Sequence, residues 1–159
     1  MKHHSEAQFD AVVRDNMPSL MAYARSITRN HSVAEEAVQE TFIRAWKYWP
    51  SFRHESPVLS WLITICRRVV IDIARNTKHT EQLMDNVVHY DHNFSNFAVE
   101  EMVKELPLPQ REVIVLCAIL GFDYKTAAQT LNIPVGTVRS RLARAREQLS
   151  SQLAQALAI

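Results

Sequence analysis

The stretch that decides the fold is FDYKTAAQTLNIPVGTVRSRLARAREQL, residues 122–149. It predicts two helices joined by a tight turn, the first over Tyr124–Leu131 and carrying alanines that suit a close helix crossing. Asn132 follows this helix, and asparagine tolerates the left-handed conformation that ends many helices. Pro134 suits the first turn of the second helix, where a missing N–H costs little. Two helices joined this closely indicate a helix-turn-helix.

The second of these helices has an apolar side and a basic side. Four of its residues follow helical spacing and are expected to pack inward: Val138, Leu142, Ala145 and Leu149. In DNA-binding helices, small polar residues near the N-terminus reach base edges while arginines hold phosphates or read guanine. The residues expected to contact DNA, two of them on the first helix, are Lys125, Thr126, Gly136, Thr137, Arg139, Ser140, Arg141 and Arg144. A solvated basic face is the alternative, but its coincidence with a helix-turn-helix favours DNA binding.

The same residues resemble a known family. The segment LNIPVGTVRSRLARAR, residues 131–146, is similar to the carboxyl-terminal domain of bacterial sigma factors of the extracytoplasmic-function group. This resemblance implies that the second helix recognises the −35 promoter element. Ala127 stands where the family usually has a larger aliphatic residue, and Asn132 stands where glycine is common. Neither position lies on the expected reading face.

Length and composition set the fold class. The chain has 159 residues and is 47% hydrophobic, enough for one domain or two small ones. Long stretches with helical periodicity predict an all-α protein. We expect two small helical domains, residues 1–79 and 99–159, joined by a flexible linker over 80–98. With only two glycines, the sequence excludes a glycine-rich phosphate loop. It also lacks an apolar stretch long enough for a membrane span and a signal peptide's apolar core, so we expect a cytoplasmic protein.

Charge is unevenly distributed behind the formal net value of +1. Residues 51–80 hold five Lys or Arg against two Asp or Glu, and residues 106–159 hold six against three. Residues 81–105, in contrast, hold six acids and one base. Two basic blocks are therefore separated by an acidic segment, which we expect to stay off DNA.

A second informative stretch is AEEAVQETFIRAWKYW, residues 34–49, which predicts an amphipathic helix capped by Ser32. Its buried side is expected to hold Ala34, Val38, Phe42, Ala45 and Trp49. By pattern alone its other side is an ordinary solvated acidic face. However, AEEAVQETFIRAW resembles the most characteristic segment of sigma factors, which usually has Asp-Leu at Glu36-Ala37. The resemblance implies binding to the clamp helices of the largest RNA polymerase subunit through Glu36, Gln39, Glu40 and Arg44. The flap of the second-largest subunit is the other polymerase contact that it implies.

Between this helix and the next, KYWPSFRHESPVLSW interleaves aromatic and basic residues, a composition that suits stacking on single-stranded bases. Pro50 ends one helix, and Ser56 and Pro57 are predicted to be the N-cap and first residue of the next, which extends to about Thr77. Trp46, Trp49 and Trp61 are expected in the core. The resemblance implies that this loop and helix open and read the −10 element, with a flipped-out base. The residues expected to do so are Arg53, His54, Trp61, Arg67, Arg68 and Arg75. Arg68 stands where the family often has asparagine, so a contact of that asparagine does not carry over.

Residues 79–99 lose helical periodicity and read as a linker. Histidines and aspartates occur there, and these residue types ligate zinc, but their spacing matches no recognised site, so we expect no metal. The residues concerned are His79, Asp85, His89, Asp91 and His92. Cys66 and Cys117 lie in apolar helical runs and are expected to be buried free thiols. Upstream, residues 5–29 predict a first helix with a kink or break at Pro18.

The sequence thus predicts a sigma factor that recruits RNA polymerase and opens promoter DNA, with no catalytic residues and no cofactor of its own. We also expect an anti-sigma protein as partner, which can hold the chain at the inner membrane face. One alternative is a helix-turn-helix regulator that uses only its carboxyl domain, and another is a sigma mimic that titrates an anti-sigma protein. The helix at residues 34–49 argues against the first alternative, and Arg139, Arg141 and Arg144 argue against the second.

Overall fold

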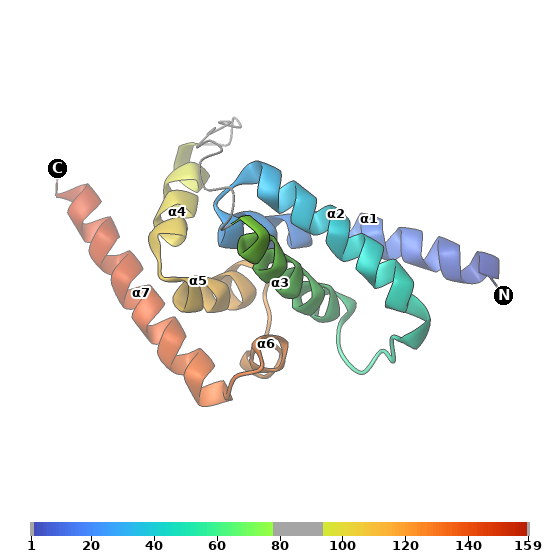
Figure 1. Ribbon diagram of the computed structural model, residues 1–159. Coiled ribbons are helices and arrows are strands. Elements are labelled where there is room, and N and C mark those ends of the chain that lie inside the picture. Colours follow the sequence, from blue (N-terminus) through green and yellow to red (C-terminus); the bar gives the residue numbers. More distant parts are fainter. Residues whose placement is uncertain (1, 78–93, 159) are drawn as a thin grey trace. The chain divides into compact units, whose positions relative to one another are not determined.

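The computed structural model describes residues 2–77 and 94–158, and within these ranges it contains helices and no strand (Figure 1). The helices form two units, α1 to α3 and α4 to α7. The prediction of an all-α protein with a helix-turn-helix in its second part is confirmed. Most of the predicted linker, and all five residues considered for a zinc site, lie outside the described residues.

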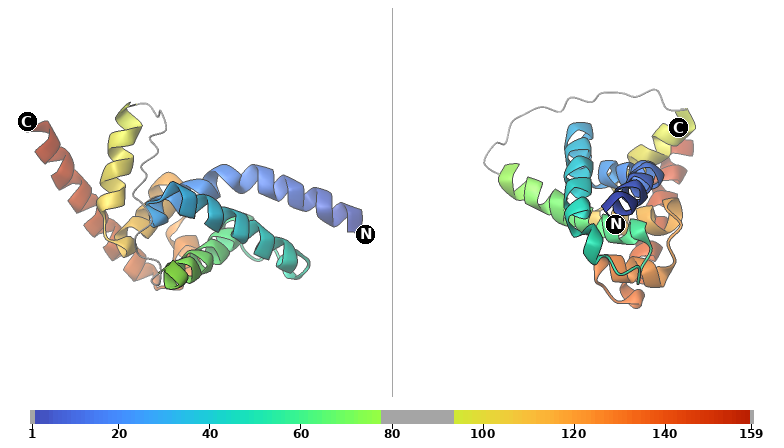
Figure 2. Two further views of the ribbon diagram at one scale, coloured as in Figure 1. Left: turned by 45° about the horizontal axis from the view of Figure 1, so that its top comes forward. Right: turned by 90° about the vertical axis from the view of Figure 1, so that its right-hand side faces the viewer.

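The first unit consists of three helices that all contact one another: α1 (Lys2–Thr28), α2 (His31–Tyr48) and α3 (Val58–Thr77). They lie side by side in both views of Figure 2. The largest side chains buried among them are Leu20, Tyr23, Val38, Leu62, Ile63 and Val69. α1 continues through Pro18, so the predicted break does not occur there.

The turn from α1 to α2 takes only two residues. Arg29 adopts a left-handed conformation with φ of 56° and ends α1. The side-chain oxygen of Asn30 then accepts a hydrogen bond from the backbone N–H of Val33 at 3.1 Å, which caps α2. The prediction that Ser32 caps this helix is therefore wrong, because Asn30 begins the helix two residues earlier.

The expected buried side of α2 is confirmed, whereas one tryptophan is placed differently. Trp46 is 46% exposed, so its assignment to the core is wrong. Trp49 is buried, and Trp61 is half-buried. Trp49 begins the short 3₁₀ helix η1 (Trp49–Ser51) after α2. α3 starts at Val58, one residue later than predicted, with the carbonyl of Pro57 accepting from the N–H of Trp61.

The second unit begins with α4 (Phe94–Glu105) and α5 (Leu108–Ile114). α5 continues into a π-helical turn, η2 (Val115–Ile119), in which the N–H of Leu120 bonds the carbonyl of Val115 five residues back. Gly121 then takes φ of 74°, a conformation that glycine adopts readily, and ends the helical run. This helical run is therefore α-helical in its first part only.

The helix-turn-helix consists of α6 (Tyr124–Leu131) and α7 (Val135–Leu157). The first helix has the predicted bounds, and Asn132 takes the predicted left-handed conformation with φ of 54° and ψ of 50°. The N–H of Ile133 reaches back to the carbonyl of Ala128 at 3.0 Å and closes the turn. Val138, Leu142 and Ala145 are buried as expected, and Leu149 is half-buried. α7 runs on beyond α6 and contacts α4 (Figure 1).

Both cysteines are free thiols, as predicted. Cys66 is buried, and this burial raises its pKa to about 11. Cys117 is half-buried, so the prediction that it is buried is wrong. None of the helices in the described ranges is both long enough and apolar enough to cross a membrane.

Candidate functional site

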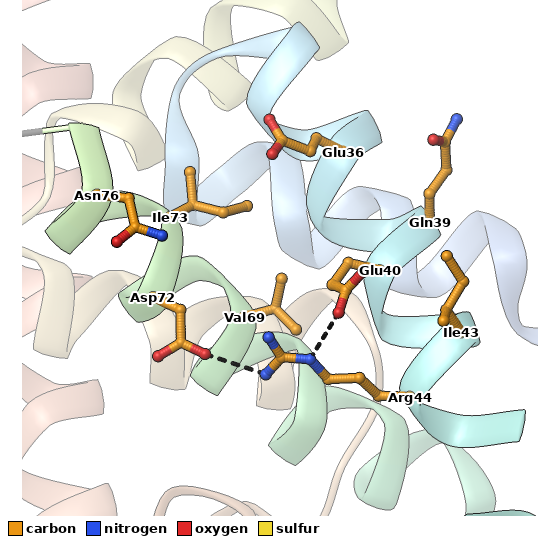
Figure 3. A pocket seen from close by; sticks show the side chains of 9 residues that line it. All are labelled: Glu36, Gln39, Glu40, Ile43, Arg44, Val69, Asp72, Ile73 and Asn76. Atoms are coloured by element: carbon orange, nitrogen blue, oxygen red, sulfur yellow. Dashed lines mark hydrogen bonds and ion pairs between the residues drawn. The ribbon is translucent and has the colours of Figure 1, made fainter. Parts of the chain in front are cut away.

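A groove of about 290 Å³ runs between α2 and α3 on the surface of the first unit (Figure 3). The side chains that line it from α2 are Glu36, Gln39, Glu40, Ile43 and Arg44, and those from α3 are Val69, Asp72, Ile73 and Asn76. All four residues predicted to contact polymerase therefore line one surface feature. We call it the α2–α3 groove.

The charges in the α2–α3 groove are partly paired within the chain. The Nε of Arg44 donates to Glu40 Oε1 at 2.8 Å, and its Nη1 donates to Asp72 Oδ2 at 3.0 Å. The hydrogen bonds to Glu40 and to Asp72, in that order, raise the pKa of the Arg44 guanidinium above its ordinary value. Arg44 thus carries a permanent charge that is shared between two carboxylates, and Glu36 adds a third carboxylate to the groove.

Two features of the α2–α3 groove were absent from the sequence prediction. Asp72 and Asn76 line it from α3, although only α2 residues were expected to meet polymerase. A signal for Asp72 exists, because it is the only acidic residue in the α3 sequence. Ile43 is 64% exposed at the groove and adds an apolar contact surface to the polar one. Figure 3 shows Gln39 pointing away from α3, whereas Arg44 reaches towards it.

An aromatic cluster surrounds Trp49 at the other end of α3. Its ring centroid lies 5.5 Å from that of Phe9, 5.6 Å from that of Phe52 and 6.2 Å from that of Trp61. Phe52 also stacks on Trp61 with centroids 4.6 Å apart. His54, with φ of 56°, packs edge-on against Phe52 at 4.5 Å. The loop before α3 is therefore anchored by ring contacts, while the side chains of Arg53 and His54 remain exposed.

The remaining residues that were predicted to contact the −10 element lie along α3 and do not form a pocket. Trp61, Arg68 and Arg75 recur at intervals of seven and so lie along one side of the helix. At 1.5 Å per residue the line from Trp61 to Arg75 is about 21 Å long. Arg68 and Arg75 are exposed, and Arg67 is half-buried. The arrangement is an extended basic strip that begins at the aromatic cluster, a shape that suits a strand of nucleic acid better than a compact ligand.

The start of the helix-turn-helix is fixed by local contacts. The carboxylate of Asp123 caps α6 by accepting a hydrogen bond from the N–H of Thr126 at 2.6 Å. This backbone hydrogen bond lowers the pKa of Asp123 below its ordinary value. The guanidinium of Arg139 lies over the ring of Tyr124, 5.9 Å from its centroid, and thereby connects α7 to α6.

The predicted DNA-contact residues lie on the outer side of α6 and α7. Lys125, Gly136, Arg139, Ser140 and Arg144 are exposed, and the half-buried members of the set are Thr126, Thr137 and Arg141. A Cβ added at Gly136 would meet no atom within 4 Å, so the fold of this chain does not require glycine there. The space in front of the first turn of α7 is open to an approaching molecule.

Comparison with known proteins gives the family. Residues 12–80 match the model of Sigma-70 region 2, and residues 96–149 match that of Sigma-70, region 4. The ECF RNA polymerase sigma factor SigC of Mycobacterium tuberculosis (strain CDC 1551 / Oshkosh) is 37% identical over 125 residues, which cover 73% of this chain and 68% of that protein. The chain belongs to the extracytoplasmic-function (ECF) sigma factors. A further relative of this sigma factor, EcfG of Rhodopseudomonas palustris (strain TIE-1), is 33% identical over 145 residues, covering 86% of this chain and 80% of the relative.

Two solved structures share the fold of this sigma factor. The sigma factor RpoE in complex with the anti-sigma factor NepR from Bartonella quintana superposes with a TM-score of 0.81 at 28% identity, covering 92% of this chain and 97% of that one. CnrH in complex with the cytosolic domain of CnrY superposes with a TM-score of 0.74 at 28% identity, covering 94% of this chain and 90% of that one. The α2–α3 groove and the basic strip thus lie in region 2, and the helix-turn-helix lies in region 4. Sigma factors are not a class of enzymes.

Proposed function

We propose that this sigma factor binds core RNA polymerase through the α2–α3 groove and directs it to promoters, reading the −35 element with α7 and melting the −10 element with the loop before α3 and α3 itself. The observation that carries the proposal is that the two units match the two sigma regions in order, and that the four residues predicted to contact polymerase line one groove of the first unit. A regulator with only a helix-turn-helix has no use for the first unit.

Polymerase binding is assigned to the exposed acidic and polar side of α2. Glu36 and Gln39 are exposed, Glu40 is half-buried, and Ile43 presents an apolar side chain beside them. An acidic rim around an apolar contact suits a basic amphipathic helix, since opposite charges guide the encounter and apolar burial holds the complex. The clamp helices of the largest subunit are the proposed partner, and the flap of the second-largest subunit is the proposed partner of the second unit.

Promoter opening is assigned to the aromatic cluster and the basic strip. An unpaired base needs a stacking surface, and the displaced backbone needs cations. The loop at residues 52–57 provides His54, which packs against the stacked rings, and an exposed Arg53 beside it. α3 provides Arg68 and Arg75 further along. The catalytic chemistry of RNA synthesis then belongs to polymerase, and the sigma factor contributes no reacting group.

Reading of the −35 element is assigned to the first turns of α7. Gly136 and Ser140 leave room for base edges, and Arg139 is held by its contact with Tyr124. A preoriented arginine suits recognition of guanine, because less side-chain freedom is lost on binding. Arg144, one turn further from Ser140, suits a phosphate. We assign Lys125 and Thr126, at the start of α6, to the adjacent DNA backbone.

Control by an anti-sigma protein is part of the proposal. It rests on the likeness to RpoE and CnrH, which were solved with the anti-sigma factor NepR and with the cytosolic domain of CnrY, respectively. We place this sigma factor in the cytoplasm and expect such a partner to hold it inactive, in some cases at the inner face of the membrane.

The polymerase assignment is tested by charge reversal at Glu36. Glu36→Lys should weaken capture of core polymerase, because it places a cation in the α2–α3 groove. Glu35→Lys is the matched control, because it makes the same charge change at the neighbouring residue. Glu35 contacts His31 and does not line the groove. DNA binding by the second unit should be the same in both variants. Equal capture by the two variants would refute the groove as the docking site.

A further inference from the structure

The ion pair that crosses the α2–α3 groove carries an inference that rests on the proposed polymerase binding and goes beyond it. We infer that Arg44 is a positioning residue. It supports polymerase binding through Asp72, by fixing how α3 is set against α2, rather than by binding polymerase itself.

The first reason is that two nitrogens of the Arg44 guanidinium are bonded to carboxylates within the chain. Its Nε is bonded to Glu40 at 2.8 Å and its Nη1 to Asp72 at 3.0 Å (Figure 3). The Arg44 side chain is 36% exposed, less than that of either carboxylate. Glu40 lies one turn before Arg44 on α2 and therefore orients the guanidinium, whereas Asp72 lies on α3 and is the member that joins the two helices.

The second reason is the kind of contact that surrounds the bridge. Val38 and Val69 bury apolar surface in the first unit, and the driving force for such burial is non-directional, so the rotation of the helices depends on how their side chains pack. An arginine hydrogen-bonded to two carboxylates has a narrow range of good geometries. The bridge therefore adds a directional constraint on the rotation of α3 about its own axis to the limits that the apolar packing sets.

The third reason is what that rotation moves. Asp72 lies four residues after Arg68 and three before Arg75 on the same helix. A roll of α3 that separates Asp72 from Arg44 therefore shifts both arginines of the basic strip, Arg68 and Arg75. It also changes the width of the α2–α3 groove, since Asp72 and Asn76 form its α3 side. One side chain thus links the polymerase surface to the strip assigned to DNA.

A double-mutant cycle separates positioning from direct contact. Binding of core polymerase is measured for the full chain, for Arg44→Met, for Asp72→Asn and for the double variant. If Arg44 acts through Asp72, both single changes weaken binding by a similar factor, on the order of tenfold, and the double variant is no weaker than the weaker single variant. If Arg44 binds polymerase itself, Arg44→Met weakens binding by the same factor in the Asp72→Asn background as in the unaltered chain.

Loss of folding is excluded by measuring binding at a temperature where circular dichroism shows all four proteins folded. A rescue adds a readout that a loss of stability alone does not give. In Arg44→Lys the side chain is shorter and no longer reaches Asp72. Adding Asp72→Glu lengthens the carboxylate side chain, restores the ion pair and should recover binding. Additive losses, absence of any loss, or no rescue would overturn the inference and leave the Glu36 result standing. Failure of the unaltered chain to bind core polymerase would overturn both proposals.

Discussion

Arg139 and Arg144 lie on the same helix and carry the same charge, yet their replacement by alanine should have different consequences for DNA binding. Arg139 is held over the ring of Tyr124 near the start of α7. Arg144 is exposed on α7, five residues further along the chain. The structure therefore suits Arg139 to a base edge and Arg144 to a phosphate.

The size of each effect follows from the kind of contact. Loss of one phosphate contact lowers the slope of log affinity against log salt by about 0.9. Between 50 and 200 mM salt, the ratio of wild-type to Arg144→Ala affinity should therefore shrink by a factor of about 3.5. Loss of a guanine contact costs about 1–3 kcal/mol at one base pair, so Arg139→Ala should relax the preference at that position by roughly 5-fold to 150-fold.

The assay is fluorescence anisotropy with a duplex that the wild-type protein selects from a randomised library, together with its single-base-pair variants. Arg14→Ala, on α1 and with a side chain that is 76% exposed, removes the same charge from a residue that belongs to none of the proposed surfaces, and it serves as the control. The assignment of α7 to DNA fails if all three variants bind every duplex alike. The division of roles between the two arginines fails if both variants show the same salt slope and the same base preference.

Three further changes test the fold that presents these surfaces. Asn132→Ala should lower the free energy of unfolding by about 1–2 kcal/mol because its φ is 54°, whereas Asn132→Gly should be nearly neutral in urea denaturation. Leu142→Ala should cost about 2–5 kcal/mol because this side chain is buried, whereas Leu157→Ala, at 86% exposure, should change little. Cys66 should resist alkylation at pH 8 while Cys117 reacts first. Burial raises the pKa of the Cys66 thiol to about 11 in the folded chain. The stability that the protonated thiol contributes is therefore fully present below pH 9 and is lost as pH rises through 11. Cys66→Ala should remove this loss of stability at high pH.

The helix-turn-helix was predictable because its signals are local. The bounds of α6, the left-handed Asn132 and the buried side of α7 depend on residues close together in sequence. The same holds for the buried side of α2. The π-turn at Val115–Ile119 was not predictable, because an apolar run has the same composition whether each N–H reaches four or five residues back.

Trp46 shows that helical periodicity does not predict burial reliably at the edge of an apolar stripe. It lies at the edge of the apolar stripe of α2, where its ring packs against Phe9 at 5.1 Å and still leaves 46% of the residue exposed. The bridge from Arg44 to Asp72 joins residues 28 apart in the chain, so it depends on how two helices meet and not on either pattern. The sequence alone therefore predicted the α2 side of the groove and missed its α3 side.

The central claim is that this chain confers promoter specificity on RNA polymerase, and transcription in vitro tests it most directly. Core polymerase from the same bacterium is incubated with a genomic fragment library, with and without the purified chain. The proposed function predicts transcripts that require the chain, start at fixed positions on few fragments and fall sharply with both Glu36→Lys and Arg139→Ala. If the chain binds DNA but yields no chain-dependent transcript from any fragment, the sigma-factor function assigned to it is contradicted.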